Sequence, residues 1–109
     1  MAAELGNRTR AAPAPMRVRW SLPAIEQLCA IREYVDEFSP DTANRIAAKI
    51  LNATDRLERF PSMGRIGRIA GYRELVITGL PYIVGYRVIE DVIDITSIIH
   101  TSRKWPVKL

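Results

Sequence analysis

The sequence predicts an α+β domain with the element order β-α-α-β-β-β, in which a helical hairpin packs on one face of a small antiparallel sheet. Two stretches with apolar residues at helical spacing follow each other closely, and strand-like segments occupy the C-terminal part. Helices and strands that are segregated along a chain are typical of α+β folds. A chain of 109 residues is large enough for one hydrophobic core but not for two.

Residues 1–15 are rich in alanine, proline and polar residues and show no periodicity, so we expect a disordered N-terminal extension. The folded domain is expected to span residues 16–109. It begins at Met16, directly before the strand-like run Arg17–Trp20. This strand should join the sheet, but the sequence does not determine its place there.

Two amphipathic helices are predicted next. The first runs from about Leu22 to Phe38 with Ser21 as its N-cap, and the second begins at Pro40 and ends before Pro61. The first apolar face carries Ile25, Leu28, Ile31 (or Arg32), Val35 and Phe38. The second carries Ala43, Ile46, Ala47, Ile50, Thr54 (or Ala53), Leu57 and Phe60. The short connection makes the two helices an antiparallel hairpin.

Residues 61–71 contain three glycines and two arginines, and they lack the spacing of a phosphate-binding loop. We expect an exposed connection here. Arg65 and Arg68, together with Arg73 just beyond, are candidates for contacting an anionic target, although ordinary loop charges are the simpler interpretation.

Three strands follow as a meander, with turns at Gly79-Leu80 and Glu90-Asp91. A two-residue loop at Glu90-Asp91 places Arg87 opposite Asp94, a favourable charge pair. Alternation then predicts an apolar face under the helices, formed by Tyr82, Val84, Tyr86, Val88, Ile93, Ile95, Ser97 and Ile99. The open face carries Ile83, Gly85, Arg87, Asp94, Thr96, Ile98 and His100.

The composition of the chain limits the kinds of partner and site that we expect. The net charge of +4 suits an anionic partner, and it also suits solubility. The single cysteine, Cys29, excludes an internal disulfide and is expected to be buried in the first helix, while the single histidine, His100, excludes a histidine-based metal site. We expect no cofactor. No apolar run approaches the ~20 residues that span a membrane, so we expect a cytoplasmic protein without a membrane partner.

Five segments together resemble the RelE/ParE superfamily of type II toxin–antitoxin toxins: Trp20–Ala24, Phe60–Gly64, Arg73–Leu75, Pro81–Val88 and Ile99–Arg103. The resemblance covers about residues 16–106. It implies a toxin held inactive by a cognate antitoxin, in a toxin–antitoxin hetero-oligomer.

The superfamily has two branches with different targets. RelE-like members cleave mRNA on the ribosome, whereas ParE-like members act on DNA gyrase. RelE-like ribonucleases carry an arginine three residues before a strand tyrosine. When that tyrosine is matched to Tyr86, the arginine position is Ile83, which favours the ParE-like branch and gyrase over the ribosome and mRNA. An inactive, antitoxin-binding relative is the third alternative.

Candidate site residues follow from these alternatives. If the chain were RelE-like, His100, Arg87 and Arg103 would be the catalytic candidates; otherwise His100 orients the tail and Arg87 pairs with Asp94. Target contact is assigned to Arg103, Lys104 and Trp105 in the C-terminal tail, supported by Arg65, Arg68 and Arg73.

Overall fold

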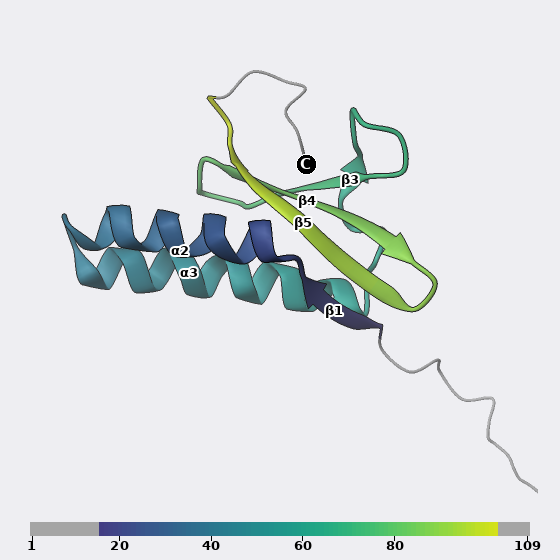
Figure 1. Ribbon diagram of the computed structural model, residues 1–109, viewed down its shortest axis with the longest axis horizontal. Coiled ribbons are helices and arrows are strands. Elements are labelled where there is room, and N and C mark those ends of the chain that lie inside the picture. The colour runs from purple at the N-terminus through teal and green to yellow at the C-terminus, as the bar shows by residue number, and fades with distance from the viewer. Residues whose placement is uncertain (1–15, 103–109) are drawn as a thin grey trace, which may run out of the picture.

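The structure, a computed structural model, describes residues 16–102, so the candidates Arg103, Lys104 and Trp105 lie outside the described residues. Two helices pack on one face of a five-stranded sheet of order β1-β5-β4-β3-β2 (Figure 1). The elements in chain order are β1 (Arg17–Trp20), α2 (Leu22–Asp36), α3 (Pro40–Asp55), the 3-10 turn η1 (Arg56–Glu58), β2 (Arg65–Ile66), β3 (Arg73–Val76), β4 (Tyr82–Ile89) and β5 (Val92–His100).

The predicted α+β class and helical hairpin are confirmed, with two differences in the sheet. β1 pairs in parallel with β5, so the sheet is mixed rather than purely antiparallel. The segment predicted as a loop contains the two-residue strand β2, which pairs with β3 and forms an edge of the sheet. The two helices carry the chain from β1 to β2 at the opposite edge of the sheet, and the successive strands β2 to β5 then return to β1. Local sequence does not encode that return.

Both helix starts follow from their capping residues. Ser21 accepts a hydrogen bond from the Ala24 amide at 3.3 Å, and Ser39 accepts one from the Thr42 amide at 3.2 Å. Each helix also has a proline in its first turn, where no intrahelical donor is needed. The two N-caps therefore set where α2 and α3 begin, as predicted.

The core lies between the helical hairpin and the adjoining face of β3, β4 and β5. Its fully buried members include Ala24, Ile50 and Leu57 from the helical side, and Tyr86 and Ile95 from the sheet. The second apolar face is confirmed through Leu57. Ala24 is the residue of α2 that is fully buried in this core.

The predicted inner face of α2 is partly wrong. Ile25 is 43 % exposed and Phe38 is 73 % exposed, and Phe60 beyond α3 is 60 % exposed. Cys29, expected to be buried, is also exposed. Phe38 lies at the connected end of the hairpin, which projects past the sheet, so no strand covers it (Figure 1). The inner face instead runs through Ala24, with Leu28, Ile31 and Val35 half-buried.

The predicted β4–β5 register is right near the turn and wrong beyond it. Pairing from Ile89–Val92 to Tyr86–Ile95 is as predicted, and Glu90 takes the positive φ of 53° that the two-residue loop requires. A β-bulge then inserts Thr96 as an extra residue in β5, so that Gly85 pairs with Ser97. The Thr96 hydroxyl donates to the Gly85 carbonyl at 3.1 Å.

The bulge exchanges the faces of the last four residues of β5. Ile98 joins the core opposite Val84, and His100 lies opposite Tyr82, whereas Ser97 and Ile99 turn to the face away from the helices. For each of these four residues, the sequence predicts the opposite face of the sheet. One extra residue moves every following side chain to the other face of the sheet. A strict alternation counted from the turn is therefore wrong beyond the bulge.

The far end of the β4–β5 hairpin extends past the helices, which corrects one more assignment. Val88, expected under the helices, is 41 % exposed.

Within residues 16–102, no helix combines the length and apolar character needed to cross a membrane.

Candidate functional site

Asp94 holds two arginines on the sheet face that lies away from the helices. Its carboxylate is 6 % exposed and accepts from Arg87 Nε at 3.2 Å and from Arg19 Nε at 3.3 Å. The guanidinium of Arg87 also lies 5.7 Å from the centre of the Tyr72 ring. The predicted Arg87–Asp94 pair is therefore confirmed, and it ties β1, β5 and β4 together.

Arg19 is a member of this cluster that sequence reasoning missed. β1 alternates Arg17, Val18, Arg19 and Trp20, and the two apolar residues pack against the core. That alternation already placed the two arginines on one face. The alternation does not identify the strand that lies beside β1. Arg19 lies opposite Asp94 because β1 pairs in parallel with β5.

Glu74 is the second buried carboxylate on this face, at 4 % exposed. One of its oxygens accepts from Arg65 Nε at 3.2 Å and Nη2 at 3.0 Å, and the other accepts from the Arg68 amide at 3.1 Å. Arg65, predicted as a loop charge, is thus paired across β2 and β3. Part of the charge that the loop offers to a target is already compensated within the protein.

Arg73 and Tyr86 make hydrogen bonds to residues 61–64, the segment that follows η1. Arg73 Nη1 donates to the Gly64 carbonyl at 2.7 Å, so this arginine is engaged in the fold. The Tyr86 hydroxyl accepts from the Gly64 amide at 2.9 Å and donates to the Pro61 carbonyl at 2.8 Å. A Cβ at Gly64 would lie 2.7 Å from the Tyr86 ring, so this position requires glycine. Burial raises the pKa of Tyr86, while the hydrogen bond from Gly64 and the charge of Arg73 act to lower it.

His100 ends β5 on the same side as the helices. Its ring meets the Tyr82 ring edge-on at a centroid distance of 5.4 Å. Its Nδ1 accepts from the Ser102 amide at 3.2 Å and lies 2.8 Å from the Ser102 hydroxyl. Burial raises the pKa of Tyr82, with a smaller contribution from Tyr34. The expectation that His100 faces the open side is therefore wrong.

His100 and Arg87 are not brought together. They lie on opposite faces of the sheet, and Arg87 pairs with Asp94, six residues before His100 on β5. Six residues of strand correspond to about 20 Å. The third catalytic candidate, Arg103, lies outside the described residues.

The position that an arginine occupies in RelE-like ribonucleases is apolar and buried here. Ile83 is 5 % exposed and lies between Val76 on β3 and Ile99 on β5, on the face away from the helices. This confirms the predicted direction of Ile83. A side chain in this position contributes packing and has no group that transfers a proton or pairs with a phosphate.

No group of three or more metal-ligating side chains comes together within residues 16–102. The arrangement on the open face is a set of carboxylate–arginine pairs beside an apolar row. Such pairs stiffen the sheet and hold guanidinium groups in place.

Comparison with known proteins gives a consistent result. Residues 18–105 match the family model described as ParE toxin of type II toxin-antitoxin system, parDE. The chain is 42 % identical over 90 residues to Putative toxin Y4kP of Sinorhizobium fredii, covering 83 % of this chain and 93 % of that protein. It is 38 % identical over 87 residues to Toxin RelE2 of Caulobacter vibrioides, covering 80 % and 97 % of the two chains.

A solved structure shares the fold. The structure titled Chromosomal ParDE TA system from P. aeruginosa superposes with a TM-score of 0.73 at 26 % identity, and the match covers 80 % of this chain and 97 % of that one. The family match extends over most of the chain, including both helices and, except for Arg17, all five strands. The chain therefore belongs to the ParE toxin family of type II toxin–antitoxin systems, within the RelE/ParE superfamily.

Proposed function

We propose that this toxin inhibits growth by poisoning DNA gyrase in the cytoplasm, and that a cognate antitoxin neutralises it in a hetero-oligomeric complex. The observation that carries the proposal is the pairing of Ile83 with Ile99 on the open face of the sheet. In the endonuclease branch, that face must supply charged groups. Here the middle of that face is formed by Ile83 and Ile99, which are uncharged and buried.

The chemistry of RNA cleavage supports the same choice. It requires a base, an acid and a cation that converge on one phosphate. Among the described residues, His100 and Arg87 occupy opposite faces, and Arg87 is held by Asp94. A toxin that acts by binding to an enzyme needs no such convergence.

Purified toxin, DNA gyrase and relaxed plasmid give a direct test. We expect lost supercoiling and an accumulation of cleaved plasmid after denaturation of the trapped complexes. Arg103→Glu, in the proposed target-binding tail with Lys104 and Trp105, should abolish the effect. Arg59→Glu makes the same change of charge at an exposed position after η1 and should preserve it. Unchanged supercoiling with the wild-type chain would refute the proposal.

The second candidate is a ribosome-dependent mRNA endonuclease that uses His100, Arg87 and Arg103. The observation that favours it is the 38 % identity to a protein named Toxin RelE2. Primer extension on translated mRNA separates the two: the gyrase proposal expects intact transcripts during growth arrest, and cuts at the ribosomal A site would establish the endonuclease. Expression without any growth defect would indicate an inactive relative that only binds its antitoxin.

A further inference from the structure

Part of the open face is buried, although the helical hairpin lies on the other side of the sheet. Ser97 is 1 % exposed, Ile99 is 3 % exposed and Ile83 is 5 % exposed, and all three side chains lie on the face away from the helices. Gly85, which pairs with Ser97, is buried as well. An antiparallel sheet with one free face leaves the side chains of that face in contact with water. Burial this complete indicates that another segment covers the row.

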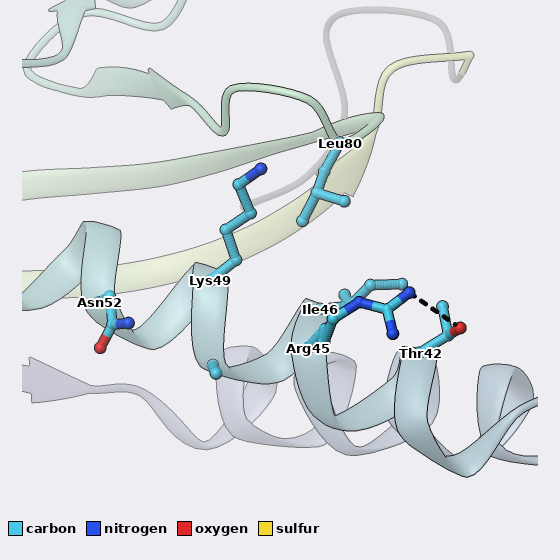
Figure 2. A pocket seen from close by; sticks show the side chains of 7 residues that line it. Thr42, Arg45, Ile46, Lys49, Asn52 and Leu80 are labelled. Atoms are coloured by element: carbon cyan, nitrogen blue, oxygen red, sulfur yellow. Dashed lines mark hydrogen bonds between the residues drawn. The ribbon is translucent and has the colours of Figure 1, made fainter.

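The described residues do not supply that cover. Within residues 16–102, α2, α3 and η1 all contribute to the core on the opposite side of the sheet, and no other helix is present. On that opposite side the cover is plain: Leu80, from the β3–β4 turn, points toward α3 (Figure 2). The segment that covers the open face therefore comes from outside the described residues.

The centre of the buried row has room for a large side chain. Gly85 has no side chain and Ser97, its partner on β5, has a small one, whereas Ile83 and Ile99 beside them are bulky. The Ser97 hydroxyl is buried and has no hydrogen-bond partner among the described residues. Buried hydroxyl groups nearly always have a partner. The place thus suits an aromatic side chain that also carries a hydrogen-bond donor, and aromatic rings are known to compensate glycines in strands by packing over them.

The chain beyond Ser102 starts within reach of this place. His100, the last residue of β5, is three residues past Ser97, which corresponds to about 10 Å. Thr101 and Ser102 then form a turn, in which the Ser102 amide donates to His100 Nδ1 at 3.2 Å. An extended chain advances about 3.3–3.6 Å per residue. The three residues 103–105 are therefore long enough to return from the turn to Ser97.

We propose that the C-terminal tail, residues 103–109, folds back over the open face and that Trp105 packs on Gly85 and Ser97. Trp105 is the one aromatic residue of the tail. Tryptophan combines a large apolar surface with a single donor, the indole N–H, which the unpaired Ser97 hydroxyl can accept. The inference goes beyond the proposed function, because it does not depend on which target the toxin has. It gives the tail's cations, Arg103 and Lys104, a fixed place on the folded domain.

Trp105 reports on its own surroundings once the other tryptophan is removed. The chain contains two tryptophans, so Trp20→Phe leaves Trp105 as the single one, and this reporter protein is the reference for the variants. We expect its fluorescence at a shorter wavelength than that of tryptophan in water, with little quenching by acrylamide. Gly85→Val fills the place under the ring with a side chain that strands accept readily. It should shift the emission to that of tryptophan in water and make it accessible to acrylamide.

Trypsin gives a second measurement, because it cleaves after Arg103 and Lys104. Cleavage follows the population of the opened tail, so Gly85→Val should speed the loss of the tail about tenfold, as followed by mass spectrometry. The matched control is Ala48→Val, which adds bulk at an exposed position in the hollow between α3 and the β3–β4 turn (Figure 2). It should leave the emission and the cleavage rate unchanged. Circular dichroism confirms that the variants are folded.

A third variant leaves the sheet itself intact and keeps the proposal testable if Gly85→Val does not fold. Trp105→Ser in the otherwise unchanged chain should uncover Ile83 and Ile99 and increase the binding of the dye anilinonaphthalene sulfonate. Unchanged dye binding would overturn the proposal. So would solvent-like emission of the reporter protein, or equal effects of Gly85→Val and Ala48→Val.

A second copy of the chain is the other possible cover for the row. Sedimentation equilibrium should show a monomer for the wild type. A dimer that Gly85→Val dissociates would overturn the proposal, because the second copy would then cover the open face. None of these measurements involves gyrase, the ribosome or growth, so the placement of the tail and the toxic activity can fail separately.

Discussion

The hydroxyl of Tyr86 should be a main determinant of stability in this toxin. The side chain is fully buried, and its hydroxyl joins β4 to the segment after η1 through the Pro61 carbonyl at 2.8 Å and the Gly64 amide at 2.9 Å. Tyr86→Phe keeps the ring and its packing, and removes only these two hydrogen bonds. The change therefore isolates the cost of two backbone groups that lose their partner.

The expected loss is about 2–4 kcal/mol. The Gly64 amide is left buried without an acceptor, which costs about 1–3 kcal/mol, and the lost bond to Pro61 adds about 1 kcal/mol. Small domains have a total stability of about 5–15 kcal/mol, so the change removes a large part of it. For a domain of this size it corresponds to a fall in Tm of about 10–20 °C.

Urea unfolding followed by circular dichroism measures this free energy directly. Tyr34→Phe is the matched control, because Tyr34 is 65 % exposed and removing its hydroxyl should cost less than about 0.5 kcal/mol. If the two variants were destabilised equally, the hydroxyl of Tyr86 would not be holding the segment. The reasoning from the hydrogen bonds would then be refuted.

Three further outcomes are expected. Burial raises the pKa of Tyr86, so the folded chain keeps this proton to a higher pH than the unfolded chain; its contribution should be complete below the unfolded value of about 10 and be lost as pH rises through the folded pKa. Urea titrations at increasing pH should show a shallower alkaline loss for Tyr86→Phe than for wild type, and parallel losses would contradict this. Asp94→Asn should lower the free energy of unfolding by about 1 kcal/mol, because its arginine partners are half-exposed; a loss unchanged in high salt would argue against ion pairing. Glu74→Gln should cost about 1–2 kcal/mol and speed hydrogen exchange at the Arg68 amide, which loses its acceptor, whereas unchanged exchange would show that the amide does not depend on Glu74.

Near the β4–β5 turn, the sequence was sufficient to predict how side chains are arranged on the open face. The Arg87–Asp94 pair and the direction of Ile83 follow from a two-residue loop and strict alternation, and both are confirmed. His100 was misplaced because Thr96 bulges out of β5. In that region the Ile98 amide donates at 2.7 Å to Gln27 Oε1 on α2. An interaction 71 residues distant in sequence leaves no local signal.

The sequence by itself determined the parts of this protein that depend on neighbours in the chain: the N-caps at Ser21 and Ser39, the two-helix hairpin, and the charge pair beside the Glu90-Asp91 turn. Tertiary structure alone decided the parallel placement of β1, the bulge at Thr96 and the faces of the residues that follow it. The physical reason is that caps and tight turns satisfy their hydrogen bonds within a few residues. Strand neighbours and bulges are selected by packing between segments that meet only in the folded chain.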